Sequence, residues 1–577
     1  MAFLRNLLAT LVGLFIFTIL GFFMLVGIAA SASADEAPTV KSNSVLYFPM
    51  SGFLMEKTVD DPFLNAFSDG PTPLSLLDII TAINKAKTDD RIKGIYIEPM
   101  YLAGSYAGLQ EIRDALLDFK ESGKFIYAYG EYISESDYYV ASVADSLFLN
   151  PTGAIEFNGL DVNITFWKGM FDKLDIQPEV FRVGEFKSYV EPYIRKDLSE
   201  ENRLQYSELL ASMYDIYLTN VANSIRIPSD KLAEISDQMK VNLPQDAVDV
   251  GLINKLGYED ELKSVMKEKL GIADDKELRT MKMNKYIQAI QSESNYSSNR
   301  IAVIVAEGDI VMGGDEGIVG ATYAEEIRKA RNNNKIKAIV MRVNSGGGSM
   351  TASDMIWREL MLTKGKKPII ASMGGAAASG GYYIAMPADT IIAQPNTITG
   401  SIGIFGMWFN FGEFLENKIG ITHDVVKTGE YSDIYTVTRP LRDSERAIIQ
   451  RGVNEGYEAF TQKVADARGM TQADVKKIAS GRVWSGEQAA KNGLVDQLGS
   501  YQDAIELAAK AAGIEDDYSV SYYPKQKPFI EEVLEKMSAK VQFTLFGMDA
   551  DPVAKAVKEI NHHKGLQARI PGNIEVR

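Results

Sequence analysis

The stretch SMGGAAASGGYYIAMPAD, residues 372–389, has a partner earlier in the chain, GEYISESDYYVASVAD, residues 130–145. When the two are aligned on the tyrosine pair that they share, Ser379 falls opposite Glu135. Matching positions on either side keep nearly the same separation, which only a tandem duplication explains. The sequence is therefore two copies of one unit, and the second copy alone carries this serine.

A second pair of matching segments differs in the opposite way. RVGEFKS, residues 182–188, resembles VKTGEYSD, residues 426–433, and there Lys187 stands opposite Ser432. The lysine is thus present only in the first copy, and Ser379 only in the second. A nucleophile and an amine divided between the copies suggest a composite Ser/Lys site.

Each copy is large enough to be a domain with its own core, unlike the units of roughly 20–50 residues that stack into solenoids. The C-terminal end of the chain has no repeat partner. The predicted divisions are an N-terminal membrane anchor at 1–35, a first α/β repeat at 36–271, a connection at 272–299, a second α/β repeat at 300–522 and a C-terminal tail at 523–577.

The pattern inside each copy is an alternation of strands and helices. Apolar, β-branched runs such as residues 336–343 and 367–373 are typical of buried parallel strands. Helical patterns lie between them, so we expect α/β domains with parallel sheets and right-handed crossovers. Each copy then continues into a helical arm, at 198–225 and 441–467.

The N-terminus is predicted to be a transmembrane helix. Residues 7–30 carry no charge, and at about 1.5 Å rise per residue they span a hydrocarbon core of roughly 30 Å. Arg5 precedes the run and acidic residues follow it, which places the N-terminus in the cytoplasm. The alternative is a cleaved signal peptide ending near SASAD, residues 31–35. The apolar run exceeds the usual core of about 7–15 residues, which favours the anchor.

Composition narrows the chemistry. The net charge of −16 and the pI near 5.0 argue against nucleic acid as a partner. The chain has no cysteine and only three histidines, His423, His562 and His563, so thiol nucleophiles and multi-histidine metal sites are excluded. We expect no metal and no cofactor, and lysine is the natural base that remains.

The glycine-rich segment NSGGGS, residues 344–349, follows a predicted strand. Backbone N–H groups exposed there could stabilise an oxyanion, at roughly 2.7–4 kcal/mol per donor. A tight strand-to-helix turn and a phosphate cradle are the alternatives. The first copy has Leu102, Ala103 and Gly104 at the three central positions. The copy without the serine thus also lacks the first two of these glycines, which favours the catalytic interpretation.

Two further segments surround the candidate serine. AAASGG, residues 376–381, would place Ser379 near a helix N-terminus, with the N–H of Gly380 as another donor, although small residues also serve tight packing. TGSIG, residues 399–403, contains Ser401, which could orient a lysine amine or only stabilise a turn. As a base Lys187 must be neutral, and burial between the copies would lower its pKa.

Together these motifs resemble the signal peptide peptidase A family of the long, duplicated, membrane-anchored type, serine proteases of the Clp protease/crotonase superfamily. The resemblance covers nearly the whole chain, including RVGEFKSYVEPY, MRVNSGGGS, AAASGGYYIA and NTITGSIGIFG. It implies the following roles: Ser379 as nucleophile, Lys187 as general base, Ser401 orienting the lysine, and Gly347 and Gly380 as oxyanion donors, with Gly346 and Gly348 beside them. The family often has proline where Gly346 stands, which leaves open which glycine N–H points inward.

The resemblance further implies a membrane-anchored serine endopeptidase that degrades remnant signal peptides and other extended apolar peptides through an acyl-enzyme. It implies a bowl-shaped homotetramer with a single-pass anchor in the cytoplasmic membrane and catalytic parts on the periplasmic side.

Two other functional classes remain. A catalytically silent, membrane-tethered peptide-binding scaffold would fit a degenerate repeat, but the losses in the two copies are complementary rather than cumulative. Acyl-CoA chemistry on a crotonase-like fold conflicts with an outward-facing chain.

Overall fold

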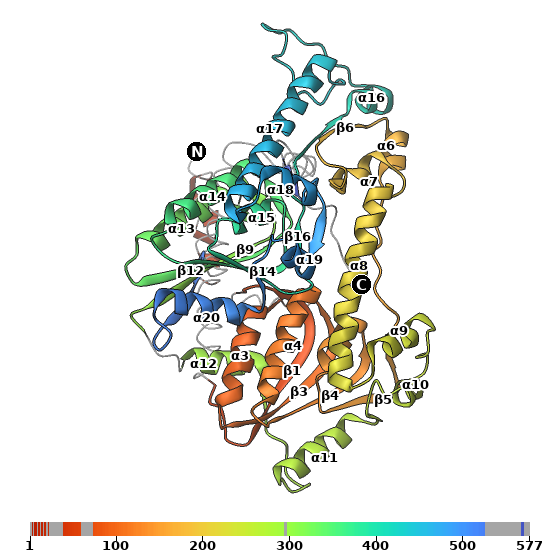
Figure 1. The fold of residues 1–577 in the computed structure, drawn as a ribbon, viewed down its shortest axis with the longest axis vertical. Helices are drawn as coiled ribbons and strands as arrows, with labels where there is room; N and C mark the ends of the chain where they lie inside the picture. Colours follow the sequence, from red (N-terminus) through yellow and green to blue (C-terminus); the bar gives the residue numbers. More distant parts are fainter. Residues whose placement is uncertain are drawn as a thin grey trace.

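The computed structural model describes residues 38–58, 73–292, 297–314, 316–525 and 567–569, together with scattered positions between 3 and 21. Within these residues the two copies form two α/β bodies stacked on each other (Figure 1). The sheet of the first copy lies in the lower half of that view and the sheet of the second copy in the upper half.

The first copy is built on a seven-stranded sheet in the order β2-β1-β3-β4-β5-β7, with β8 also paired to β1. All its strand pairs are parallel. The helices α3, α4 and α5 pack on one face of the sheet, and α11 packs on the other. Because both faces are covered, the strands are apolar along most of their length. The bounds are β1 (Ser44–Met55), β2 (Pro73–Ser75), α3 (Leu76–Thr88), β3 (Ile92–Ala103), α4 (Tyr106–Lys120), β4 (Phe125–Ile133), α5 (Glu135–Ala141), β5 (Ser146–Ile155), α9 (Ser229–Asp237), α10 (Pro244–Asp249), β7 (Lys255–Leu256), α11 (Glu259–Leu270), β8 (Thr280–Lys282) and α12 (Met283–Ser292).

The second copy repeats this plan with an eight-stranded sheet in the order β18-β16-β14-β12-β9-β20, to which β15 and β19 are attached. Its pairs are parallel except for β16 with β18. The helices α13, α14, α15 and α17 cover one face, and α20 covers the other. The bounds are β9 (Arg300–Glu307), α13 (Gly320–Asn332), β12 (Ile336–Ser345), α14 (Met350–Thr363), β14 (Ile369–Ala378), α15 (Gly380–Ala385), β15 (Thr390–Ala393), β16 (Ile398–Gly400), α16 (Gly412–Phe414), α17 (Asp443–Arg468), α18 (Gln472–Ile478), β18 (Val483–Ser485), α19 (Gly486–Lys491), β19 (Gln497–Leu498), α20 (Tyr501–Ala512) and β20 (Ser519–Tyr523).

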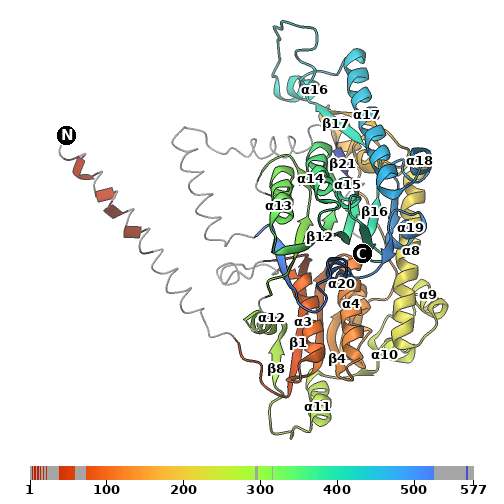
Figure 2. The ribbon, with the colours of Figure 1, turned by 60° about the vertical axis from the view of Figure 1, so that its left-hand side comes forward.

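A third, mixed sheet joins the two copies. Its strand order is β11-β10-β13-β21-β17-β6, and it includes one strand of the first copy, β6 (Gln177–Arg182). That strand runs antiparallel to β17 (Phe405–Asn410) of the second copy over its whole length. The remaining strands are β10 (Ile310–Val311), β11 (Ile318–Val319), β13 (Gly347–Ser349) and β21 (Gln567–Arg569). Figure 2 shows β21 beside α15 and β17.

The long helix α8 (Glu200–Ile225) is the arm of the first copy and runs along the side of both bodies (Figure 1). The short helices α6 (Lys168–Leu174) and α7 (Glu191–Ile194) lie at its upper end. On α8 the hydroxyl of Ser212 lies 2.8 Å from that of Ser485, and Gln205 accepts a 3.3 Å hydrogen bond from the Val483 backbone N–H. The arm thereby attaches the first copy to β18 of the second.

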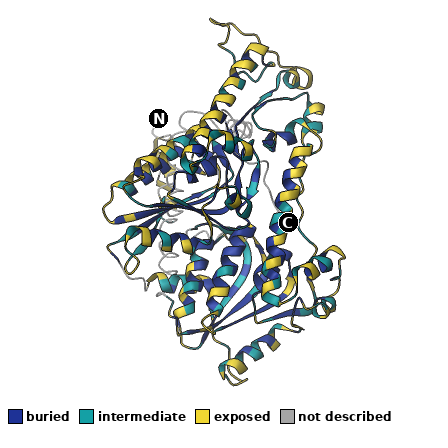
Figure 3. Ribbon diagram, viewed as in Figure 1, coloured by how far each residue is buried: buried dark blue, intermediate teal, exposed yellow. Residues whose placement is uncertain are grey.

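A buried charged cluster also lies between the copies. The guanidinium of Arg342 in β12 is completely buried and bonds Glu56 at 2.7 Å and Glu111 at 2.8 Å, both in the first copy. The buried residues of Figure 3 accordingly extend through the region where the bodies meet. The copies therefore share an interior and are held in one relative position.

Two segments that the sequence leaves outside the domains are part of the sheets. Residues 272–299, predicted as a connection, include β8 and α12, which pack on the first copy, where Tyr286 donates a 3.0 Å hydrogen bond to Asp89. The predicted tail 523–577 includes β21, which lies inside the mixed sheet. The expected parallel pairing is found throughout the first copy and in all strand pairs of the second copy except β16 with β18, whereas the mixed sheet was not predicted.

The predicted transmembrane helix falls mostly outside the described residues. In the part of the chain that the structure describes, no helix has the length and apolar character needed to cross a bilayer.

Candidate active site

Ser379 stands at a sharp turn between β14 and α15. Its φ of 56° and ψ of −112° lie in a region that residues with side chains rarely adopt. The turn is fixed by two hydrogen bonds, from the Ser379 N–H to the Gly400 carbonyl at 2.8 Å and from the Tyr383 N–H to the Ser379 carbonyl at 2.9 Å. Such strain persists only where surrounding contacts enforce it, and it is common at catalytic positions.

Lys187 reaches the second copy because of the mixed sheet. The pairing of β6 with β17 ends at Arg182 opposite Phe405, and the chain then turns toward the second copy. The Phe186 N–H donates to the Ser480 carbonyl at 3.0 Å, and Gln205 of α8 donates to the Phe186 carbonyl at 3.2 Å. The backbone of the residue before the lysine is thus held by both copies.

The two candidate residues meet within one chain although 192 positions separate them. The Lys187 Nζ lies 2.8 Å from the Ser379 Oγ, and 3.1 Å from both the Oγ and the carbonyl oxygen of Ser401. All three residues are fully buried. The three sequence-predicted side chains therefore form one hydrogen-bonded group.

The surroundings of Lys187 favour a neutral amine. Its hydrogen-bond partners in the described part of the chain are two hydroxyls and a carbonyl, with no carboxylate among them. Burial without a compensating anion lowers the pKa of Lys187 well below its usual value. A neutral amine at this distance can accept the serine proton.

Two glycines of the second copy make room for the lysine stem, and sequence analysis assigned no role to either. A Cβ on Gly481 would stand 2.6 Å from the Cβ of Lys187, and one on Gly403 would stand 3.3 Å from its Cδ. Gly403 lies within the TGSIG segment, but no local pattern marks Gly481, because its importance arises only where the copies touch.

The glycine loop lies against the start of α15. Gly347 and Gly348 are in β13, and the backbone nitrogen of Gly348 lies 3.0 Å from where a Cβ on Gly380 would stand. Gly380 is the first residue of α15, so its N–H has no acceptor within the helix. The Gly347 N–H donates to the Ser345 hydroxyl at 3.1 Å, while Gly346 precedes the strand. The predicted Gly347 donor is therefore already engaged.

In the first copy the equivalent loop is closed by a carboxylate. Asp137 accepts hydrogen bonds from the backbone N–H groups of Tyr101 at 2.9 Å and Leu102 at 3.1 Å. Burial raises the pKa of Asp137 to about 6. The backbone N–H groups of this loop in the first copy are therefore used in structural hydrogen bonds. This agrees with the absence of the serine from the same copy.

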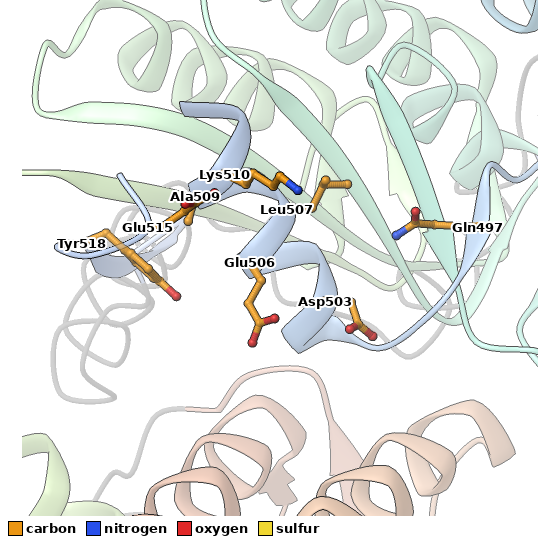
Figure 4. Close-up of a pocket in the computed structure, with 8 residues that line it drawn as sticks. All are labelled: Gln497, Asp503, Glu506, Leu507, Ala509, Lys510, Glu515 and Tyr518. Atoms are coloured by element: carbon orange, nitrogen blue, oxygen red, sulfur yellow. The ribbon is translucent and has the colours of Figure 1, made fainter. Parts of the chain in front are cut away.

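A surface hollow of about 440 Å³ lies elsewhere, on α20 (Figure 4). Its lining includes Asp503, Glu506 and Lys510, and none of the candidate catalytic residues. It is therefore separate from the Ser379 site.

Fold and sequence together define the class of this protein, a serine protease with a Clp-protease-like α/β fold. Residues 292–399 match the Clp protease family, and residues 118–273 and 361–515 each match peptidase family S49. The chain belongs to peptidase family S49 and contains two segments that match this family.

Relatives match over most of the chain. Protease 4 of Salmonella typhi is 36% identical over 87% of this chain and 84% of its own length. Protease 4 of Haemophilus influenzae is 33% identical, covering 94% and 92%. The chloroplastic serine protease SPPA of Arabidopsis thaliana is 32% identical, covering 92% and 78%. The predicted relationship to the signal peptide peptidase A family is confirmed.

Proposed function

We propose that this S49 protease hydrolyses extended apolar peptides, remnant signal peptides among them, through an acyl-enzyme on Ser379 with Lys187 as general base. The observation that carries the proposal is the 2.8 Å contact between the Lys187 Nζ and the Ser379 Oγ in a fully buried setting. Since the described contacts of that lysine include no carboxylate, the amine is suited to take up a proton rather than to neutralise an anion.

In the proposed mechanism neutral Lys187 accepts the Ser379 proton as the Oγ attacks the substrate carbonyl carbon. Backbone N–H groups at Gly380 and in the glycine loop stabilise the oxyanion. The protonated lysine then donates its proton to the leaving amine, and the acyl-enzyme forms. Water activated by the same lysine hydrolyses the ester. Ser401 is a positioning residue, since its hydroxyl and carbonyl both contact the Lys187 Nζ.

The test is hydrolysis of a fluorogenic apolar peptide by residues 36–577, comparing the wild type with Ser379→Ala and Lys187→Ala. Both variants should be inactive while their circular dichroism and light scattering match the wild type. Activity that survives both changes would rule out this site, and a silent wild type that binds the peptide would instead support a scaffold.

We also propose a single-pass anchor at residues 7–30 in the cytoplasmic membrane, catalytic parts on the periplasmic side and assembly into a homotetramer. The uncharged N-terminal run and the charges around it support the anchor. Release of the full-length chain from membranes by carbonate would contradict it. A monomeric mass for residues 36–577 by light scattering would contradict the tetramer.

A further inference from the structure

The buried side chain of Gln205, on the first-copy arm α8, lies beside the segment that carries Lys187. Its Nε2 donates to the Phe186 carbonyl at 3.2 Å and to the Ser188 hydroxyl at 2.7 Å. These two residues come directly before and after the lysine. One carboxamide, in a residue that is 1% exposed, thus holds the chain on both sides of the proposed base.

The oxygen of the same carboxamide contacts the second copy. Gln205 Oε1 accepts a 3.3 Å hydrogen bond from the Val483 backbone N–H. Val483 is the first residue of β18, and the carbonyl of the preceding residue, Arg482, accepts the Ser401 N–H at 2.6 Å. Gln205 therefore links the segment that presents Lys187 to the segment that holds Ser401, whose hydroxyl contacts the lysine Nζ.

A buried carboxylate fixes the orientation of this amide. Glu191 is completely buried and its carboxylate can only accept hydrogen bonds, so the Nδ2 of Asn202 faces it, at 2.9 Å. The Oδ1 of Asn202 then accepts from the Gln205 Nε2 and from the Ser188 hydroxyl, both at 2.8 Å. The nitrogen of the Gln205 amide consequently points to the lysine segment, and its oxygen to the Val483 N–H, which can only donate.

Glu191 also ties the network to the start of the arm and to the strand before the lysine. It accepts hydrogen bonds from the backbone N–H of Ser199 at 3.2 Å and from its hydroxyl at 2.6 Å, where α8 begins. Arg182, at the end of β6, lies 3.7 Å from Glu191 and donates to the Lys187 carbonyl at 3.2 Å. The lysine segment is thus held on several sides by one connected set of polar groups.

The second copy lacks this glutamine as well as the lysine. The helices α8 and α17 both contain 26 residues, and alignment of their first residues places Ile448 opposite Gln205. The Ile448 side chain cannot form hydrogen bonds, and the residue is 41% exposed. The counterpart of Lys187 in that copy is Ser432. The amide is therefore present only in the copy that carries the lysine, as expected of a residue that serves it.

We propose that Gln205 is a positioning residue that sets the distance between Lys187 and Ser379. The inference rests on the proposed function of these two residues. The hydrogen bonds of the lysine amine itself go to Ser379 and Ser401, so Gln205 acts through the backbone and not on the reacting atoms. Loss of the carboxamide frees residues 186–188 to move, which lengthens the contact between amine and serine and admits water to the amine.

The experiment compares Gln205→Met with the wild type in hydrolysis of a fluorogenic apolar peptide by the purified full-length chain. Methionine is of similar length but has no amide, so kcat should fall by about 10- to 100-fold while KM stays near the wild-type value. Hydration of the amine raises the pKa of Lys187 toward its usual value. The rise of kcat/KM with pH should therefore move to higher pH in the variant.

Ser212→Ala is the matched control. Ser212 also joins α8 to the second copy, through a 2.8 Å contact with the Ser485 hydroxyl, but about two turns further along the helix. This variant should keep the wild-type kcat and pH profile even if its urea midpoint falls. Equal losses of kcat in Ser212→Ala and Gln205→Met would show that the glutamine only attaches the arm, and would overturn the proposal.

A milder variant covers the case in which Gln205→Met does not fold. Ser188→Ala removes one partner of the amide and leaves only a small space. Its kcat should fall and its pH profile should move in the same direction as in Gln205→Met. If the methionine variant is unfolded, a wild-type kcat and pH profile in Ser188→Ala overturns the proposal.

Lys187→Ala separates this inference from the proposed function. If that variant is inactive while Gln205→Met keeps the wild-type kcat and pH profile, the positioning role is overturned and the proposed function stands. If Lys187→Ala hydrolyses the peptide at the wild-type rate, both are overturned. A wild type that hydrolyses no peptide overturns both as well.

Discussion

The carboxylate of Glu135 accepts a 2.9 Å hydrogen bond from the backbone N–H of Asn158. The same carboxylate accepts another, at 2.9 Å, from the N–H of Gly159. Glu135 is the first-copy counterpart of Ser379, so the position of the proposed nucleophile in one copy holds a loop in place in the other. The same position of the repeat thus has a structural role in the first copy and a proposed catalytic role in the second.

Replacement of Glu135 by alanine should therefore lower the free energy of unfolding without changing the rate of peptide hydrolysis. Two hydrogen bonds from backbone N–H groups to the buried carboxylate are lost, which costs about 1–3 kcal/mol. Urea denaturation measures the loss, and peptide hydrolysis by the folded variant should match the wild type. Glu131→Ala, at an exposed position nearby, is the control and should leave the midpoint unchanged. An equal effect of both changes would contradict the role assigned to Glu135.

The pH dependence of hydrolysis should report Lys187. Since only the neutral amine can take up the serine proton, kcat/KM should rise with pH through the lysine pKa and then level off. Burial lowers that pKa well below 10.5, so the plateau should begin well below that pH. Initial rates at substrate concentrations far below KM give the profile. A rate that is still climbing at pH 10.5 would mean that the lysine is not desolvated in solution.

Lys187→Met should abolish hydrolysis and raise the Tm. The pKa of Lys187 is lower in the folded chain than in the unfolded chain, so this lysine lowers the free energy of unfolding. The destabilisation is greatest below the folded-state pKa. It becomes smaller as the pH rises toward 10.5. The difference in Tm between variant and wild type should accordingly narrow from about pH 6 to about pH 9. Thermal unfolding followed by circular dichroism measures the Tm of both proteins. A difference in Tm that stays constant or widens as the pH rises would contradict a lowered pKa of Lys187.

Gly481→Ala should impair catalysis by displacing Lys187. The added methyl would stand 2.6 Å from the Lys187 Cβ and displace the lysine, and a shift of about 1 Å costs on the order of 10²-fold in rate. Gly469→Ala is a matched control, because Gly469 also has a positive φ, +64°, but has nothing within 4 Å of the new methyl. Both variants place an alanine at a positive φ, +79° and +64°, so only a selective fall in kcat for Gly481→Ala supports this packing role.

Arg342→Met should weaken the attachment of the two copies. It leaves the buried carboxylates of Glu56 and Glu111 without their cation, and such losses cost about 3–5 kcal/mol. Arg451→Met removes an exposed pair with Glu455 and should cost less than about 1 kcal/mol. Denaturant midpoints compare the two. Similar midpoints would show that the buried cluster contributes little to the association of the copies.

Much of this protein can be predicted from its sequence. The duplication, the alternation of strands and helices and the opposite losses of Ser379 and Lys187 are visible as local patterns, because each depends on residues close together in the chain. These patterns indicated Ser379 and Lys187, whereas the role of Ser401 was implied only by the resemblance to the signal peptide peptidase A family.

The tertiary structure decided how those residues meet. Lys187 reaches Ser379 because β6 of the first copy pairs with β17 of the second, and pairing between distant strands has no local signal. The importance of Gly481 depends on the same contact. The strand β21 has only three residues, too few to show a periodicity in the sequence. Its position beside the glycine loop therefore follows only from its pairing with β13 and β17. Sequence determined which groups are present, and long-range strand pairing determined which of them touch.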